Sequence, residues 1–306
     1  MQPMIGILLL AVVTLALAVI AERRHTRLRG RVRTLEKHIR GVEARTDRAE
    51  RHVYAALARQ RLHAAGREPV MPVRFLSQFG EDAFIWDLLE DQLDGFYIEV
   101  GAFDGENLST TYALECVGWT GLLVEPLPTR FEQCVRNRPK SRVVRAAVGA
   151  RGATGSVQFE ALESSIDPMA DLASSIRLPK IQQELAAHAQ AATRKVEAPL
   201  TTLARLLDET PGGPPSRIDV AVIDVEGFER DVLDGLELDR FRPRVLFVED
   251  LTGGAETAAA GILHSAGFTE TGWLGHNRVW VDGREPALVR RARMLHEGGA
   301  AKRGLV

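Results

Sequence analysis

The sequence predicts an α/β fold whose mostly parallel sheet ends in an antiparallel hairpin and is preceded by a membrane-spanning helix and a helical coiled-coil stalk. Three observations predict it. Phe96–Val100 and Gly121–Glu125 are short apolar runs without the alternation of a half-exposed strand, which is typical of central strands covered on both faces. Gly267–Asp282 has the pattern of a closing hairpin. An uncharged apolar run and a basic helical pattern stand in front of these strands.

Length and composition fit one large domain with an appendage. The chain has 306 residues, of which 45% are apolar and 26% charged. Its net charge of −2 conceals a basic front, because residues 22–68 carry 14 Arg or Lys against 6 Asp or Glu. Cys116 and Cys134 are the only cysteines and form no Cys-x-x-Cys pair, so neither a zinc site nor a disulfide framework is indicated. We expect a reduced, cytosolic compartment and no nucleic-acid partner.

Residues 1–21 are predicted to anchor the chain in a lipid bilayer. Met4–Ala21 carries no charge and is close to the ~20 residues that cross a bilayer as a helix. No Lys or Arg precedes this run, which favours a membrane span over the alternative, a cleaved signal peptide. Six arginines follow between Arg23 and Arg33, so the positive-inside rule places the rest of the chain in the cytoplasm. The sequence thus predicts a single-pass membrane protein.

Residues 22–65 are predicted to form the basic coiled-coil stalk. Apolar positions step by four and three from Leu28 to Val42 and continue more weakly to Val53, a spacing that indicates a coiled coil and hence a homo-oligomer. An amphipathic helix packed on its own domain is the alternative, because the core positions turn small and polar after Val42. Residues 66–73 follow as a linker, 74–285 as the main domain, and 286–306 as a C-terminal helix and tail.

The turn after the first strand carries the pattern of a nucleotide site. Gly101 and Gly105 are expected to let the backbone turn tightly and approach a ligand. Glu125 ends the next strand about 20 residues later, where an acid binds ribose hydroxyls in βαβ sites. The order Glu-x-Gly-x-x-x-Gly departs from Gly-x-Gly-x-x-Gly, which disfavours a nicotinamide-dependent oxidoreductase.

A second motif brings carboxylates to the same predicted sheet edge. Ile218–Glu226 delivers Asp224 and Glu226, and the strand Arg244–Val248 is followed by Glu249 and Asp250. Such a cluster is unfavourable without a cation, a proton or a basic substrate. Two uses stay open: a Mg²⁺ site made by Asp224, Glu249 and Asp250, or a catalytic carboxylate set of Asp224, Glu226 and Glu249 with Asp224 as general base. Singly, Glu226 and Asp250 also fit ordinary helix starts.

These motifs together resemble the FkbM-type family of S-adenosylmethionine-dependent methyltransferases. The resemblance spans roughly Arg74 to Gly283 and rests on Ser77–Asp82, Tyr97–Gly105, Ser109–Tyr112, Gly118–Gly121, Leu123–Pro126 and the Ile-Asp-Val-Glu-Gly run that ends at Gly227. It implies a Rossmann-like class I methyltransferase with a seven-stranded sheet. It also implies that S-adenosylmethionine is bound by Glu99, Gly101, Ala102, Asp104, Gly105, Glu125 and Ala147. Thr110 departs from the Ser-Asn-Thr of related sequences, which removes an amide at that position.

The resemblance and the predicted anchor imply methyl transfer to an oxygen, namely a sugar hydroxyl of a glycan or glycolipid precursor or of a small-molecule acceptor. An inactive methyltransferase-fold scaffold that oligomerises at the membrane is the rival. Between the motifs, Arg142–Val148 is predicted as a third strand and Gly155–Leu162 as a further extended segment. Residues Glu163–Lys195 form an insertion that fits a lid over the site and solvated surface helices equally well.

Overall fold

The computed structural model describes residues 44–163 and 192–303, and before them the single positions 29, 32, 37, 39, 41 and 42. The predicted membrane span, Met4–Ala21, and residues 164–191 of the predicted insertion lie outside these ranges. No helix in the described part of the chain is long and apolar enough to cross a membrane. The chain divides into two compact units, Met1–Val53 and Tyr54–Val306.

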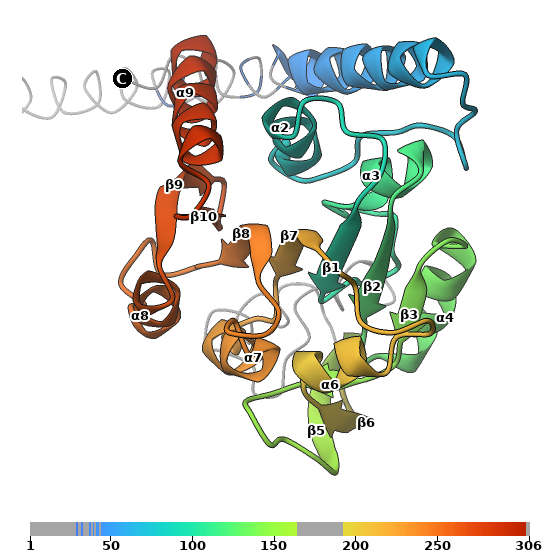
Figure 1. Ribbon diagram of the computed structural model, residues 1–306, viewed down its shortest axis with the longest axis vertical. Coiled ribbons are helices and arrows are strands. Elements are labelled where there is room, and N and C mark those ends of the chain that lie inside the picture. The colour runs from blue at the N-terminus through green and yellow to red at the C-terminus, as the bar shows by residue number, and fades with distance from the viewer. Residues whose placement is uncertain are drawn as a thin grey trace, which may run out of the picture. The chain divides into compact units, whose positions relative to one another are not determined.

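The larger unit is built on a seven-stranded sheet (Figure 1). In spatial order the strands are β3 (Arg142–Val144), β2 (Thr120–Val124), β1 (Phe96–Val100), β7 (Ile218–Ile223), β8 (Pro243–Glu249), β10 (Asn277–Asp282) and β9 (Phe268–Leu274). The first five are mutually parallel, whereas β10 is antiparallel to both of its neighbours. The predicted sheet with its closing antiparallel hairpin is therefore confirmed.

Helices cover both faces of this sheet (Figure 1). One face carries α2 (Glu81–Leu88), α3 (Tyr112–Val117) and α9 (Pro286–Arg303), the other carries α6 (Leu203–Asp208), α7 (Glu229–Leu236) and α8 (Ala258–Ser265), and α4 (Pro128–Asn137) packs beside β3. Successive residues of a strand point to opposite faces. Tyr97 and Ile98 accordingly belong to different apolar clusters, and both are fully buried. This explains why the central strands are apolar without alternation.

A second, three-stranded sheet corrects the predicted third strand. Only Arg142–Val144 pairs with β2, and β4 (Ala147–Val148) pairs instead with β6 (Ala192–Thr201). β6 is antiparallel to β5 (Ser156–Glu163), the segment predicted as extended. The chain thus leaves the main sheet between the two halves of one apolar run. The predicted insertion is also shorter at its end, because Ala192–Lys195 already belongs to β6.

The end of the predicted stalk packs into the main body. Residues 44–64 are helical, and within the larger unit Ala55, Ala58 and Leu62 are buried in the cluster that includes Phe75 and Trp86. The alternative reading, an amphipathic helix packed on its own domain, therefore applies to the part after Tyr54. Earlier seam positions such as Ile39 and Val42 are exposed. The coiled coil itself stays a prediction.

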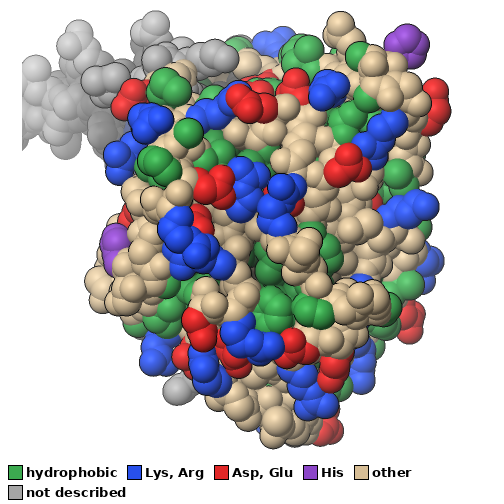
Figure 2. All heavy atoms as spheres, viewed as in Figure 1, with side chains coloured by type: hydrophobic (Ala, Val, Ile, Leu, Met, Phe, Trp, Pro, Cys, Tyr) green, Lys and Arg blue, Asp and Glu red, His purple; other side chains and the backbone are tan. Residues whose placement is uncertain are grey.

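The outer surface has the charge pattern of a solvated face. On the side viewed in Figure 2, basic and acidic side chains are interspersed. Ion pairs such as Arg240 with Asp208 and Arg205 with Glu209 are of this kind. Exposed pairs contribute little to stability, with a median of about 0–1 kcal/mol each. The acids inside the larger unit, such as Glu99 and Glu115, are buried instead.

Candidate active site

A cavity of about 340 Å³ lies at the carboxyl ends of β1, β2, β7 and β8, where ligands bind in open α/β sheets. This volume is within the range of small-molecule sites. Of the residues predicted to form the site, those that line the cavity are Glu99, Gly101, Ala102, Glu125, Ala147, Asp224, Glu226 and Glu249. Asp104, Gly105 and Asp250 do not line it. Two groups of acids flank the cavity: the β1–β2 edge (Glu99 and Glu125, with Asp104 behind them) and the β7–β8 edge (Asp224, Glu226, Glu249).

The two glycines after β1 lie in a tight turn, as predicted, and nearby protein atoms add a second reason for glycine there. Gly101 has φ +83°, and a Cβ there would lie 1.9 Å from the backbone oxygen of Asp224. Gly105 has φ +77°, and its Cβ would lie 2.7 Å from the Sγ of Cys134. Both positions therefore need glycine because the backbone is left-handed there and protein atoms lie close by. Gly101 also lines the cavity, whereas Gly105 packs on α4 behind it.

Glu125 follows β2 directly and shapes the cavity with its carboxylate. Its Oε2 accepts a hydrogen bond of 2.9 Å from the Phe103 amide, and its Oε1 accepts one of 2.8 Å from the Leu127 amide. These bonds hold two loops at the β1–β2 edge. A carboxylate has about four acceptor positions, so Glu125, which borders the cavity, is also placed to accept from a ligand hydroxyl.

The other two acids of the β1–β2 edge organise the turn that follows β1. Glu99, 4% exposed, accepts from the hydroxyls of Ser109 and Thr111 and from the Thr110 amide. Thr110 makes this contact through its backbone amide, so the contact does not need the asparagine side chain that related sequences carry at this position. Asp104 accepts from the amides of Glu106 and Asn107. Asp104 is thus placed as a turn residue rather than a cavity residue.

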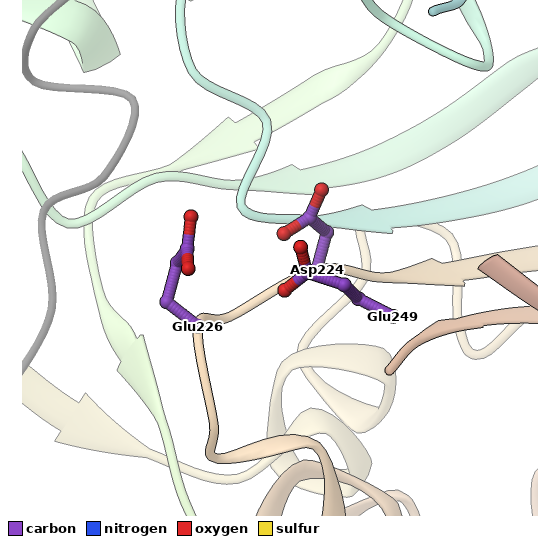
Figure 3. Close-up of side chains that lie close together, drawn as sticks. All are labelled: Asp224, Glu226 and Glu249. Atoms are coloured by element: carbon purple, nitrogen blue, oxygen red, sulfur yellow. The ribbon is translucent and has the colours of Figure 1, made fainter. Parts of the chain in front are cut away.

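Three carboxylates meet at the β7–β8 edge. Asp224 and Glu226 follow β7 and Glu249 ends β8, and one oxygen from each lies within 4.8 Å of the others (Figure 3). The Asp224 amide continues the sheet ladder by donating to the Val100 carbonyl at 3.1 Å. Glu226 has φ +57°, a strained conformation for a residue with a Cβ. Such strain is concentrated at functional sites.

Burial and mutual repulsion raise the pKa values of this cluster. Asp224 is open to the cavity but enclosed by the surrounding protein, and desolvation, followed by its carboxylate neighbours, raises its pKa to about 6. Desolvation and the nearby Asp224 and Glu226 raise the pKa of Glu249 far more. Asp224 and Glu249 share a hydrogen bond. At neutral pH the pair therefore holds one proton between its two carboxyl groups.

Asp250 does not belong to this group in the described structure, which corrects the predicted metal set. Its side chain accepts from the Thr252 amide and hydroxyl and from the Gly254 amide, and it forms a 3.3 Å ion pair with Arg278. The residue after a strand's last residue points to the other face of the sheet. Glu249 and Asp250 are adjacent in sequence, so only one of them reaches the cavity.

Glu81 and Asn277 are two of the polar residues that line the cavity beyond those predicted. Glu81 begins α2 and is 1% exposed, and burial raises its pKa. Its Oε1 accepts a 2.8 Å hydrogen bond from the Asn277 side chain, which lies opposite Glu249 in the β8–β10 ladder. In the sequence, Glu81 looks like an ordinary helix-start acid. The signals in the sequence were the apolar helix pattern from Phe84 to Leu89 and the run Ser77–Asp82, which is among the motifs that resemble the family.

Comparison with known proteins identifies the domain that contains these edges. The family model described as the methyltransferase FkbM domain matches residues 99–268, more than half of the chain. The matched range begins at Glu99 and includes Glu125, Asp224 and Glu249. A search of curated protein sequences found no match.

A search of solved structures matched several methyltransferases. A TehB-like S-adenosylmethionine-dependent methyltransferase from Corynebacterium glutamicum is 12% identical over 76% of this chain and 98% of its own, with a TM-score of 0.35. A precorrin-6y C5,15-methyltransferase from Geobacter metallireducens is 14% identical over 65% and 84%, with a TM-score of 0.34. The METTL16 methyltransferase domain is 13% identical over 76% and 79%, with a TM-score of 0.39.

The family match decides the identity of the chain. This protein belongs to the FkbM methyltransferase family and is an S-adenosylmethionine-dependent methyltransferase. The resemblance seen in the sequence motifs is thereby confirmed.

Proposed function

We propose that this FkbM-family methyltransferase transfers its methyl group to a hydroxyl oxygen, with Asp224 as the acceptor of the hydroxyl proton. The observation that carries the proposal is the position of Asp224: it shares one cavity with Glu99 and Glu125, and its raised pKa of about 6 leaves it mostly ionised at neutral pH. A base is most useful when its pKa lies near the working pH. An ionised carboxylate with a pKa near 6 meets this condition.

The residues present fit the cofactor. The cavity has the volume of a small-molecule site, Glu125 offers its carboxylate to ribose hydroxyls, and Gly101 and Ala102 line the wall between the two edges. When bound, S-adenosylmethionine supplies a methyl group activated by a positively charged sulfur. The acidic lining favours that positive charge.

The chain's own task is to position and deprotonate the acceptor. With the cofactor bound, its sulfur would accept the electron pair of the broken carbon–sulfur bond while the hydroxyl oxygen, held in line by the chain, takes the methyl group. The hydroxyl proton passes to the Asp224 carboxylate. The hydrogen bond that Asp224 shares with Glu249 helps to hold the Asp224 carboxylate in place. Positioning supplies much of the rate enhancement, and the base contributes about 10²- to 10⁴-fold.

Calorimetric titration with S-adenosylhomocysteine and with NAD tests the cofactor class. Binding of the first alone is expected. Binding of neither by a folded protein would favour an inactive scaffold. Transfer of labelled methyl groups to fractionated lipid and glycan extracts then tests the acceptor class, and label in an amine or carbon product alone would contradict hydroxyl methylation.

A divalent cation is the second candidate use of the cluster. The observation that favours it is the approach of three carboxylate oxygens from Asp224, Glu226 and Glu249 to within 4.8 Å. Oxygen donors are what Mg²⁺ prefers. If a cation is used, EDTA abolishes turnover and Mg²⁺ restores it. If Asp224 acts as a base alone, turnover is indifferent to chelation.

We further propose that the enzyme is membrane-anchored, oligomerises through its stalk, and acts in the cytoplasm on a sugar hydroxyl of a glycan or glycolipid precursor. The support is the apolar run Met4–Ala21, the arginines behind it, and the spacing from Leu28 to Val53. Light scattering tests the stalk: a chain from Arg27 is expected to self-associate and one from Tyr54 to be monomeric. If both chains contain the same number of protomers, the coiled-coil prediction is wrong. Flotation of the full chain with vesicles tests the anchor.

The starting point matters, because Ala55, Ala58 and Leu62 are core residues. A chain that starts near Pro72 would lose them and expose their partners. Its behaviour would report lost packing rather than a lost stalk.

A further inference from the structure

Arg138 is a fully buried cation beneath the cofactor cavity. It follows the last residue of α4, its backbone leaves the helix there, and its side chain is 0% exposed. It does not line the cavity. An arginine that ends a helix is ordinarily solvated. Complete burial therefore calls for partners that match its charge and its five N–H donors.

The guanidinium donates hydrogen bonds to β1, to the turn that follows β1 and to α3, all of which lie at the β1–β2 edge. Nε donates to Glu115 of α3 at 2.9 Å, and Nη2 donates to the hydroxyls of Tyr97 at 2.5 Å and Thr111 at 2.7 Å. Nη1 donates to the Gly105 carbonyl at 3.0 Å, the Ser109 hydroxyl at 3.1 Å and Glu99 at 3.4 Å. One rigid side chain thus joins β1, the turn after it and α3.

The turn is held between Arg138 and Glu99. Ser109 and Thr111 each contact both groups, since their hydroxyls donate to the Glu99 carboxylate and accept from Arg138. At the other end of the turn, a Cβ on Gly105 would lie 2.8 Å from the Cγ of Arg138. The segment from Gly105 to Thr111 is therefore packed and hydrogen-bonded against this one side chain.

Charge balance adds a second reason for Arg138. Glu99 and Glu115 are 4% and 0% exposed, and among the described residues Arg138 is the cation in ion-pair contact with either. Desolvation opposes its charge, but Tyr97 and the two glutamates outweigh this and raise its pKa above the ordinary value of an arginine. Arg138 consequently stays charged and compensates the acid that faces the cavity.

We propose that Arg138 is a positioning residue for the cofactor: it fixes Glu99 and the turn Gly105–Thr111 in the arrangement that forms the cofactor wall of the cavity. It acts through Glu99, Ser109 and Thr110, which line the cavity, without reaching the cofactor itself. This inference rests on the cofactor site of the methyltransferase family and is independent of the acceptor chemistry proposed above.

The test compares Arg138→Lys with Arg242→Lys. Lysine keeps the charge but loses the fork that contacts several groups at once. Arg242 is the matched control, because it is largely buried, pairs with Asp282 at 2.8 Å and precedes β8 at the end of the strands opposite the cavity. Calorimetry gives the Kd for S-adenosylhomocysteine, and thermal unfolding without cofactor gives the Tm.

Both substitutions are expected to lower the Tm, and only Arg138→Lys is expected to raise the Kd, by roughly tenfold to a hundredfold, as for buried polar groups left without partners. An unchanged Kd in folded Arg138→Lys would overturn the proposal, as would an equal loss in Arg242→Lys. The proposal also expects Arg138→Lys and Glu99→Gln to be non-additive in binding, because one acts through the other. Additive losses would assign Arg138 a structural role only.

If Arg138→Lys does not fold, Thr111→Val tests the positioning role of Arg138 instead. The change preserves shape, removes one hydroxyl shared by Arg138 and Glu99, and lies outside the cavity lining. A severalfold rise in the Kd is expected, and an unchanged Kd would overturn the proposal. Since the readout is cofactor binding, failure of the hydroxyl-acceptor proposal would leave these values unaffected.

Discussion

The two acidic edges of the cavity use the same residue type in opposite ways. At the β1–β2 edge, Glu99, Asp104 and Glu125 are satisfied by backbone amides, hydroxyls and a buried arginine. At the β7–β8 edge, Asp224, Glu226 and Glu249 face one another, and Asp224 and Glu249 share a hydrogen bond. The first arrangement builds loops, whereas the second raises pKa values.

This difference separates binding from chemistry. Carboxylates that accept several hydrogen bonds from loop amides and hydroxyls fix the positions of those loops. Carboxylates that repel one another retain a proton or bind a cation. They are therefore suited to exchange that proton or cation with a substrate. We thus expect substitutions at the β1–β2 edge to change affinity and those at the β7–β8 edge to change rate.

The largest expected effect separates the two members of the carboxyl pair. Asp224→Asn keeps the shape but removes the base, so turnover is expected to fall about 10²- to 10⁴-fold with little change in S-adenosylhomocysteine affinity. Glu249→Gln imitates the protonated Glu249 and is expected to retain most activity. Single-turnover methyl transfer and calorimetry measure the two quantities.

The outcome also separates the proposed roles. Equal large losses in Asp224→Asn and Glu249→Gln, together with sensitivity to EDTA, would favour a cation over a base. Wild-type turnover in Asp224→Asn would make Asp224 a structural residue and remove the distinction between the edges.

Gly101 is the point where the two edges touch, and its substitution should disturb both. Gly101→Ala places a Cβ 1.9 Å from the Asp224 carbonyl oxygen at φ +83°. Backbone strain and overpacking together are expected to cost roughly 2–4 kcal/mol of unfolding free energy. Urea unfolding measures this. Gly152→Ala, at φ +82° with no atom within 4 Å of its Cβ, is the matched control and isolates the strain alone. Equal losses would show that the contact with Asp224 is unimportant.

The sequence predicted the sheet and its edges because they follow from local patterns. Phe96–Val100 is observed as predicted, and Asp224 and Glu249 lie together because parallel strands share a carboxyl edge. Long-range packing was not predictable in this way. An apolar run does not reveal that Ala147 joins a different sheet from Val144, nor does a heptad pattern reveal that Leu62 packs on the body.

Charged residues show the same limit more sharply. Glu81, Arg138 and Asp250 each follow or begin an element, which in a sequence indicates a solvated end. Burial decides their roles: Glu81 faces the cavity, Arg138 lies beneath it, and Asp250 is turned away to Arg278. The glycines were predicted correctly as tight positions, but the atoms that require them come from distant segments.

Glu125→Ala is expected to have the next largest effect, on cofactor affinity rather than on the rate of methyl transfer. It leaves the Phe103 and Leu127 amides without their acceptor and removes an acceptor from the cavity. We expect a loss of about 1–3 kcal/mol in binding of S-adenosylhomocysteine, measured by calorimetry. Asp250→Ala is the control, because that carboxylate also takes two amides after a strand but does not line the cavity. An unchanged affinity in folded Glu125→Ala would remove Glu125 from the site.

The smallest expected effect is a pH dependence of stability that originates at the β7–β8 edge. The folded-state pKa of Asp224 is raised to about 6 from an ordinary value of 3.8, chiefly by desolvation. A raised carboxyl pKa means that the folded protein holds the proton more tightly, so the contribution of this group is fully present below about pH 4 and is lost as pH rises through about 6. Because Asp224 is open to the cavity, solvent screening limits its share to about 1 kcal/mol or less.

Urea unfolding of the cofactor-free protein between pH 4 and pH 7 isolates this share when wild type is compared with Asp224→Asn. Wild type should lose more stability than the variant across that window. Glu81, Asp82 and Glu229 also have pKa values raised by burial and add the same slope to both proteins. Asp282→Asn gives the opposite case: hydrogen bonds from Arg242 and Arg284 outweigh desolvation and lower the pKa of Asp282, so its loss should destabilise the protein at every pH above about 4. If Asp224→Asn reproduces the wild-type slope, the carboxylates of the β7–β8 edge are as well satisfied as those of the β1–β2 edge, and the contrast between them is wrong.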